Sequence, residues 1–353
     1  MSVEDGWAAL HLDRPPQVPR TEYSVERHWD LLKAVTGQAV GPDSAPEVML
    51  EVQALFFKKW NYGLRWSTFI NRKAFEGGRC TDMGHAEYAA GGTDRRDTVT
   101  CPFTTPEECL SFDPLDEYGP VDKAAARRAF EENYRSKCEK FRDGVNMSGV
   151  YITLFSGLID IFGWDMLLTA GGTDMAAFGE VARRYERWIT PYFEAFAESD
   201  VPVMMSHDDI VWTSGPVFPP AWYREYIFPA YARMWRPVLD AGKRLLFTSD
   251  GDYTMFFDDI VTAGAHVLVM EPMSDMALFA EKYGRTHGFV GNADTRVLLS
   301  GTRAEIRAEV ERCMAIGKDC PGFFMAVGNH IPANTPVANA LYYNEVYEEL
   351  SRR

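Results

Sequence analysis

Acidic, amide and imidazole side chains follow directly after five apolar runs in the second half of the chain. Each run is typical of a buried strand in a parallel sheet, whose last side chains project into a cleft. Carboxylates that crowd there raise one another's pKa unless a cation neutralises them. Three alternatives follow: a divalent metal site, a carboxylate acid or base, or caps of the helices that come next. The polar positions are His207, Asp208, Asp209, Asp250, Asp252, Glu271, Asn292, Asp294, Asn329 and His330.

We expect a functional role at Asp250, Glu271 and His330. Asp250 is a candidate catalytic group together with Asp209 and His207, although His207 could equally be a satisfied buried imidazole. A glycine-rich region over residues 64–116 has no clear period, and loops of that length are often functional. Arg72 and His85 lie in that region and could line a cleft. The expected substrate-binding residues are Arg79, Asp82, Asn292, Asp294 and Asn329.

The spacing of the strands predicts the architecture that would bring these groups together. Strand starts near residues 203, 245, 266, 288 and 323 lie about 20 to 40 residues apart, the size of a βα unit. Because consecutive βα units cross over right-handedly, they form either a closed barrel or an open doubly wound sheet. No G-x-G-x-x-G follows any strand, which disfavours a dinucleotide fold. We therefore predict an α/β fold, a TIM-type (β/α)8 barrel with extra N-terminal helices and arm, whose polar groups meet at one rim.

We expect a single domain over residues 1–353, with an N-terminal arm and helices in 1–60 and the barrel core over about 145–350. The prolines of residues 1–22 predict an extended arm that wraps the domain or packs on a second subunit, as in a homodimer. A strand is expected at 149–155, and Pro229 and Pro237 predict a kink or break in a helix over 221–241. Predicted helix starts are the capping box at Thr302 and the Thr335-Pro336 pair. Other expected helices are 23–36, 46–61, 121–142, 174–198, 253–263, 275–283, 303–316 and 336–351.

Composition excludes several classes of partner. The net charge of −15 leaves no basic stripe for nucleic acid. No run of 18 apolar residues predicts a membrane span, and the first residues lack the features of a secretory signal. Six scattered cysteines are typical of a reduced compartment, so we expect a cytoplasmic protein.

These motifs, in this order, resemble the uroporphyrinogen decarboxylase (URO-D) superfamily over roughly residues 145–350. That superfamily contains the decarboxylase of haem biosynthesis and methyltransferases that exchange methyl groups with corrinoid proteins. The resemblance implies a TIM-type barrel with its site at the mouth. The residues that carry it are 207–210, 218–223, 247–252, Glu271-Pro272, 291–295 with Leu298-Leu299, and 329–336.

Departures from the superfamily patterns bear on activity. The Arg-Gln-x-Gly-Arg run of the true decarboxylase, which binds porphyrin carboxylates, is absent here. The coenzyme M type of methyltransferase is more similar, but it holds zinc with a His-x-Cys pair, a Glu and a later Cys. Its first two positions are Thr248 and Asp250 here, Glu271 is kept, and the last falls near Asn329, beside His330. The resemblance implies either Zn²⁺ or another divalent ion on Asp250, Glu271 and His330, or no metal and a proton-handling Asp250.

The resemblance favours the corrinoid-dependent methyltransferase branch. In this hypothesis the protein moves a methyl group between a small-molecule donor or acceptor and a corrinoid, as in methylcobalamin, carried on a partner protein. A second hypothesis is a carboxy-lyase acting on a porphyrinogen or a smaller acid, with Asp250 or Asp82 steadying a protonated intermediate. A third is a barrel that binds a tetrapyrrole or a corrinoid protein without turnover.

Overall fold

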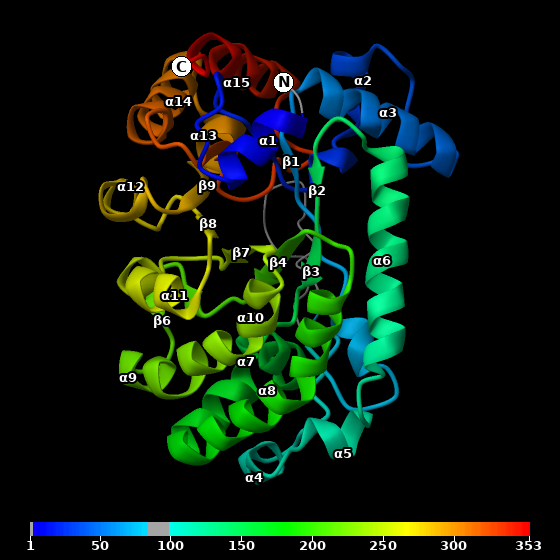
Figure 1. The fold of residues 1–353 in the computed structure, drawn as a ribbon, viewed down its shortest axis with the longest axis vertical. Helices are drawn as coiled ribbons and strands as arrows, with labels where there is room; N and C mark the ends of the chain where they lie inside the picture. Colours follow the sequence, from blue (N-terminus) through cyan, green and yellow to red (C-terminus); the bar gives the residue numbers. More distant parts are fainter. Residues whose placement is uncertain (1–2, 84–98) are drawn as a thin grey trace.

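Six parallel strands form one continuous sheet in the computed structural model, which describes residues 3–83 and 99–353 (Figure 1). Neighbouring strands in this sheet follow one another along the chain, in the order β3, β4, β7, β8, β9 and β10. This is the arrangement that successive right-handed βα units produce. The bounds are β3 Ser148–Val150, β4 Val203–His207, β7 Arg244–Thr248, β8 Val267–Val269, β9 Gly288–Ala293 and β10 Phe323–Val327.

Shorter segments from the N-terminal half close this sheet into a ring. The backbone N–H of Thr21 donates to the carbonyl of Met325 in β10 (3.1 Å). The N–H of Gly63 donates to the carbonyl of Arg20 (3.0 Å), and β1, which starts one residue later, pairs in parallel with β2. One residue separates β2 from β3, so these two short strands continue one another and connect β1 to the six-stranded sheet. The ring is therefore complete, and the predicted TIM-type barrel is confirmed. The bounds are β1 Leu64–Arg65 and β2 Val145–Asn146.

The N-terminal residues differ from the predicted extended arm. Helix α1 spans Val3–Leu10, and the residues that follow it build the closing strand of the barrel. Gln17 forms a bridge with Arg352, and Tyr23 forms one with His330. The open edge of β10 offers unpaired backbone groups, and this segment satisfies them. The predicted extended arm is therefore wrong for α1, whereas residues 17–23 are extended and pack on the domain as predicted.

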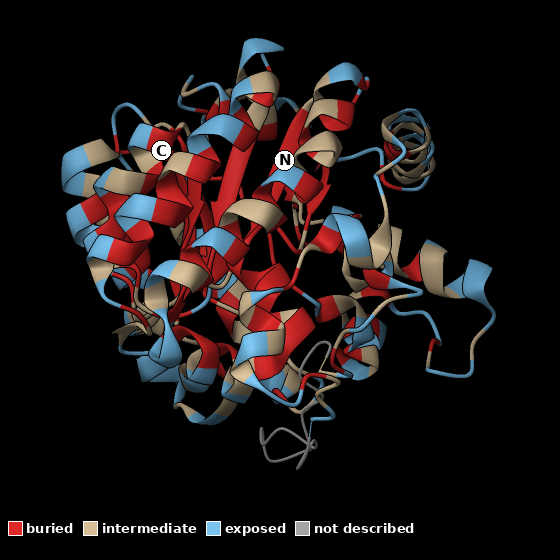
Figure 2. Cartoon of the chain, turned by 90° about the horizontal axis from the view of Figure 1, so that it is seen from below, coloured by how far each residue is buried: buried red, intermediate tan, exposed pale blue. Residues whose placement is uncertain are grey.

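Apolar side chains fill two layers, because successive side chains of a strand point to opposite faces. The first layer fills the barrel interior and includes Met205, Leu246, Val269 and Phe324, all buried. The second lies between the barrel and its helices and includes Phe247. Figure 2 shows buried strands at the centre and surrounding helices whose outer faces are exposed.

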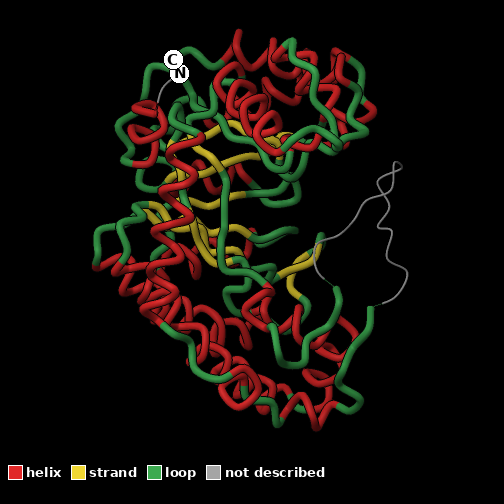
Figure 3. The backbone as a smooth tube through the Cα atoms, turned by 90° about the vertical axis from the view of Figure 1, so that its right-hand side faces the viewer, coloured by secondary structure: helices red, strands yellow, loops and turns green. Residues whose placement is uncertain are grey.

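Helices enclose the strands on the outside of the barrel (Figure 3). Among the described residues, no helix is long and apolar enough to cross a membrane. The longer helices are α2 Trp29–Thr36, α3 Pro46–Lys59, α6 Lys123–Lys140, α7 Phe155–Thr173, α8 Met175–Glu198, α10 Phe228–Asp240, α11 Phe257–Ala263, α12 Met276–Tyr283, α13 Thr295–Ser300, α14 Arg303–Gly317 and α15 Val337–Leu350. The shorter elements are α4 Pro106–Leu110, α5 Pro114–Tyr118, α9 Pro220–Trp222, the π-helix η3 Tyr223–Ile227, the 3₁₀ turns η1 Val25–Arg27, η2 Arg72–Phe75 and η4 Thr254–Phe256, and the hairpin β5 Val211–Trp212 with β6 Gly215–Pro216.

Local sequence signals predicted some of these boundaries correctly. The capping box at Thr302 is present, with its side chain and that of Glu305 each bonded to the other's backbone. The predicted helix over 221–241 is divided by a π-helix, and Pro229 lies in the first turn of α10. Two details were wrong. The strand at 149–155 ends at Val150, because α7 already begins at Phe155, and α15 is not capped by the side chain of Thr335.

Candidate active site

The side chains that face the barrel interior continue past the strand ends onto one rim. In β4 the interior residue Met205 is followed two positions later by His207 and then by Asp209. In β7 two such steps lead from Leu246 through Thr248 to Asp250, and in β8 one step leads from Val269 to Glu271. Because parallel strands end on the same side of the barrel, the twofold alternation brings these groups together.

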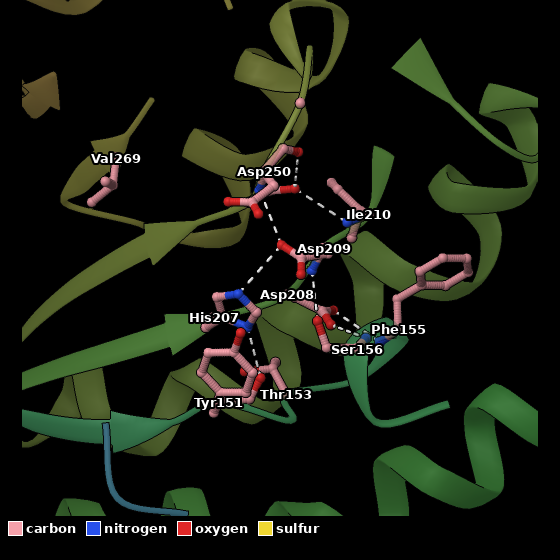
Figure 4. Close-up of polar contacts among 12 residues, drawn as sticks. Tyr151, Thr153, Phe155, Ser156, His207, Asp208, Asp209, Ile210, Asp250 and Val269 are labelled. Atoms are coloured by element: carbon pink, nitrogen blue, oxygen red, sulfur yellow. Dashed lines mark hydrogen bonds and ion pairs between the residues drawn. The ribbon is translucent and has the colours of Figure 1, made fainter. Parts of the chain in front are cut away.

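Asp209 connects the catalytic candidates (Figure 4). Its Oδ1 lies 3.3 Å from Nε2 of His207 and accepts the backbone N–H of Asp250 at 3.0 Å. The backbone N–H of Asp209 donates to Oγ of Ser156 at 2.7 Å, which ties this segment to the start of α7. The prediction that distant acidic and imidazole groups gather at one end of the barrel is confirmed for these residues.

The imidazole of His207 is held in a fixed orientation. Nδ1 lies 2.8 Å from the carbonyl of Tyr151, and since a carbonyl only accepts, Nδ1 carries a proton. The two rings stack, with centroids 3.8 Å apart and an angle of 9° between their planes. Burial alone would lower the pKa of His207, but the carboxylates of Asp209 and Asp250 raise it to about 9. At neutral pH the ring is therefore an imidazolium that donates to Asp209.

Asp250 lies at this rim with part of its surface exposed, while neighbouring protein atoms desolvate its carboxyl. The resulting desolvation, followed by the charges of Asp209 and Glu271, raises the pKa of Asp250 well above its ordinary value, and His207 opposes this shift only in part. A carboxyl with a raised pKa keeps its proton to higher pH than an ordinary aspartic acid does, which suits Asp250 to general-acid work.

Glu271 is hydrogen-bonded to the loop that carries Asp250. Its Oε2 accepts the backbone N–H of Gly251 at 2.6 Å, and its Oε1 accepts a hydrogen bond from the amide of Asn329. Burial raises the pKa of Glu271, although both hydrogen bonds oppose that shift. The side-chain oxygen of Asn329 accepts from the backbone of His330 at 2.8 Å. Glu271 and Asn329 thus support the loop that presents Asp250.

Comparison with known proteins agrees with this barrel and rim. The family model for uroporphyrinogen decarboxylase (URO-D) matches residues 152–350, more than half of the chain. The chain belongs to the URO-D family. The predicted resemblance over roughly residues 145–350 is thereby confirmed.

Two curated relatives and one solved structure describe the extent of the similarity. A uroporphyrinogen decarboxylase of Thermus thermophilus is 27% identical over 160 residues, which is 45% of each protein. That of Pelobacter propionicus is 26% identical over 140 residues, 40% of this chain and 41% of the relative. The chain thus aligns with less than half the length of these URO-D relatives. A methyltransferase from Methanosarcina mazei shares the fold across 99% of both chains, with a TM-score of 0.64 and 16% identity.

The predicted metal ligands of this URO-D chain do not form a metal site. Within residues 3–83 and 99–353, no three His, Cys, Asp or Glu side chains are arranged to hold an ion. Both oxygens of Glu271 already accept N–H groups. Oxygens that are engaged in this way are poor ligands for Zn²⁺. The residues present therefore do not fit the implied zinc.

The remaining predicted substrate residues have other partners. Asn292 donates to the carbonyls of Glu271 (3.0 Å) and Ser274 (3.2 Å), which makes it a brace within the rim. Asp294 caps α13 and pairs with Arg296 at 2.7 Å.

Two predicted residues of the glycine-rich region have other partners as well. Arg79 pairs with Glu117 at 2.8 Å and stacks over Phe103. Asp82 accepts the backbone N–H of Thr100 at 2.7 Å, and His85 lies outside the described residues. Substrate contacts by Arg79, Asp82, Asn292, Asp294 and Asn329 stay predictions.

Three residues near the rim have roles that the sequence did not reveal. Asp208 faces away from the interior and accepts the backbone N–H groups of Phe155 (3.0 Å) and Ser156 (2.5 Å), so it anchors the start of α7. Tyr23 contributes to the interior layer, its ring packs edge-on against Trp66 with centroids 4.7 Å apart, and its buried hydroxyl has no hydrogen bond among the described residues.

Asp160 on α7 is the third. Burial raises the pKa of its carboxyl to about 6, the nearby Asp209 adds to this, and Arg72 and His207 oppose it. Asp160 thus belongs to the same electrostatic cluster. A lone carboxylate within the apolar run from Gly157 to Phe162 was the available signal.

We expect Asp160→Asn to stabilise the protein. A folded-state pKa above the unfolded one means that unfolding releases the proton, so Asp160 lowers stability increasingly as pH rises from about 4 to above 6. A shift of about two units bounds the gain at roughly 3 kcal/mol near pH 8. Urea unfolding at pH 5 and pH 8 should show a larger gain at pH 8. Asp165→Asn, an exposed position on the same helix, is the control, and an equal gain at both pH values would contradict the assignment.

Proposed function

We propose that this chain is a URO-D-type methyltransferase. It moves a methyl group between a small substrate and a corrinoid carried on a partner protein. The observation that carries the proposal is the cluster of His207, Asp209 and Asp250 at the rim, in which Asp209 contacts both the His207 ring and the backbone of Asp250 and the pKa of the Asp250 carboxyl is raised. When the partner docks, the reduced corrinoid supplies the nucleophile that accepts the methyl group.

The chemistry asked of this chain is the activation of the leaving atom. The bond between the methyl carbon and the substrate heteroatom breaks, and the heteroatom keeps the electron pair. Asp250 donates its proton to that atom, so the substrate leaves as a neutral alcohol, amine or thiol. The His207 imidazolium stabilises the Asp250 carboxylate that remains, against the opposing charge of Asp209, and solvent returns the proton.

Charges of both signs meet at the rim. The carboxylate of Asp209 acts electrostatically on Asp160, Asp250 and Glu271, and the cations that act on these groups include His207, Arg72 and Arg296. A porphyrinogen brings several carboxylates, and the arginine-containing run that binds them in the true decarboxylase is absent from this sequence. Its decarboxylation is therefore the weaker candidate.

A carboxy-lyase of a smaller acid is the second candidate, because the same proton has a use there. Loss of CO₂ leaves an electron pair on carbon, and Asp250 would donate its proton to that carbon. The similarity to two named uroporphyrinogen decarboxylases supports keeping this alternative. Chromatographic loss of a carboxylic acid without any change at cobalt would favour it.

The test is a spectroscopic one. The protein is incubated with reduced cobalamin and a panel of methyl ethers, thioethers and amines, and in reverse with methylcobalamin and the demethylated acceptors. We expect the cobalt absorption bands to convert with at least one compound. No conversion in either direction, with free cobalamin or with a corrinoid protein, would count against the proposal.

A further inference from the structure

Arg65 occupies a position where an apolar residue is expected. Its neighbour Leu64 points into the barrel interior, so Arg65 in β1 points outward into the layer between the barrel and its helices. There the guanidinium carbon lies 3.2 Å from the ring centre of Phe141 and 4.7 Å from that of Phe57. A charged group at such a place is costly unless something compensates it.

No carboxylate pairs with this cation in the described part of the chain. Nη1 of Arg65 is buried without a hydrogen-bond partner, and Glu26 acts on Arg65 only from beyond ion-pair distance. A second cation, Lys137 of α6, donates to Oγ of Ser67. Burial, and then the charge of Arg65, lowers the pKa of Lys137 to about 7. Two cations thus lie close together in a chain whose net charge is −15.

The same arginine lines a small hollow of about 30 Å³. Four cationic side chains and one acidic side chain contribute to it, and the acidic one, Asp143, is 3.8 Å from Lys58. The hydroxyl of Tyr62, a buried lining residue, has no hydrogen bond among the described residues. The lining residues are Ala54, Phe57, Lys58, Tyr62, Arg65, Lys140, Phe141, Arg142, Asp143 and Gly144.

The hollow is separate from the proposed active site. Residues 140–144 come directly before β2, and Tyr62 comes shortly before β1. The hollow therefore lies towards the end of the barrel where its strands begin, whereas Asp250 follows the end of β7. A ligand bound there does not compete with a substrate at the rim.

We propose that this hollow binds a small oxyanion of the phosphate class. Arg65 supplies the planar donor fork that suits such a group, and its stacking on Phe141 and Phe57 holds that fork in place. Lys140 and Arg142 add charge at the entrance, where both side chains are exposed. The anion supplies the counter-charge that the described residues lack.

The experiment is titration of the whole protein with inorganic phosphate, followed by calorimetry and by thermal unfolding, against chloride at matched ionic strength. We expect saturable binding and a rise of the unfolding midpoint with phosphate. Arg65→Met keeps the packing on both phenylalanines and should weaken binding about tenfold or more, since it removes charged hydrogen bonds. Lys140→Gln should weaken it several-fold, a smaller loss because this side chain is exposed.

Arg233→Met is the matched control, because it removes the same charge from an ion pair with Glu186 on α8. It should bind phosphate as the unaltered protein does. Absence of a saturable effect overturns the proposal, and so does equal binding by Arg65→Met and Lys140→Gln. If Arg65→Met does not fold, the phosphate binding of Lys140→Gln alone tests the proposal, and unchanged binding by that variant overturns it. Because the experiment measures binding and not turnover, its outcome is independent of the methyltransferase proposal.

Discussion

Replacing Asp250 with asparagine is expected to lower kcat/KM for methyl transfer by about 10²- to 10⁴-fold, the usual contribution of a general acid. Asparagine keeps the size of the side chain but cannot deliver a proton to the leaving heteroatom. Because desolvation and the charges of Asp209 and Glu271 raise the pKa of Asp250, the unaltered enzyme should lose activity as pH rises through that value. The residual activity of Asp250→Asn should lack this limb of the pH profile.

Asp252→Asn provides the matched control two residues away. Oδ1 of Asp252 accepts the backbone N–H of Thr254 at 3.0 Å, and asparagine can make the same bond. Its activity and pH profile should therefore match those of the unaltered enzyme. If Asp250→Asn turned over normally while still binding a corrinoid protein, Asp250 would not be the acid. Binding of a corrinoid protein by the unaltered chain without any turnover would instead favour the non-catalytic binder.

The alternation of side chains explains why part of this site was predictable. An apolar run that ends in a polar residue marks a strand whose last side chains reach the rim, and that rule brought His207, Asp250 and Glu271 together. This rule does not predict whether each polar side chain points to the barrel interior or to the surrounding helices. His207 and Asp209 face the cluster, whereas Asp208 between them turns outward to the start of α7. A one-residue shift in register would have reversed those roles.

Tertiary context explains what the sequence did not disclose. The closing strand contains Arg20 and Glu22, two charged residues that point to the same, outward face. The segment therefore lacks the apolar run that would have predicted a strand. Asp160 comes from a helix, and only the packing of α7 against the barrel brings its carboxyl near Asp209. The predicted metal ligands illustrate a related limit. Ligand types can be read from the sequence, but the N–H donors that already occupy the oxygens of Glu271 cannot.

The closing strand carries the largest expected effect on stability, at a fully buried ion pair. The guanidinium of Arg20 lies 2.7 Å from Oε1 of Glu22 and 4.5 Å from the ring centres of Trp60 and Tyr347. Oε2 of Glu22 accepts the backbone N–H of Val327 at 2.9 Å. The pair therefore joins the closing strand to β10 and to α15, so it holds the barrel shut.

Arg20→Met is expected to lower the free energy of unfolding by about 3–5 kcal/mol, because Glu22 would stay buried without its cation. The combination Arg20→Met with Glu22→Gln should recover part of that loss, since neither charge then remains. Arg303→Met is the control: it breaks an ion pair with Glu345 at 3.5 Å in which both side chains are mostly exposed, and it should cost less than about 1 kcal/mol. Urea unfolding at neutral pH measures all three. Equal losses for Arg20→Met and Arg303→Met would mean that the barrel is held shut by backbone pairing and apolar packing alone.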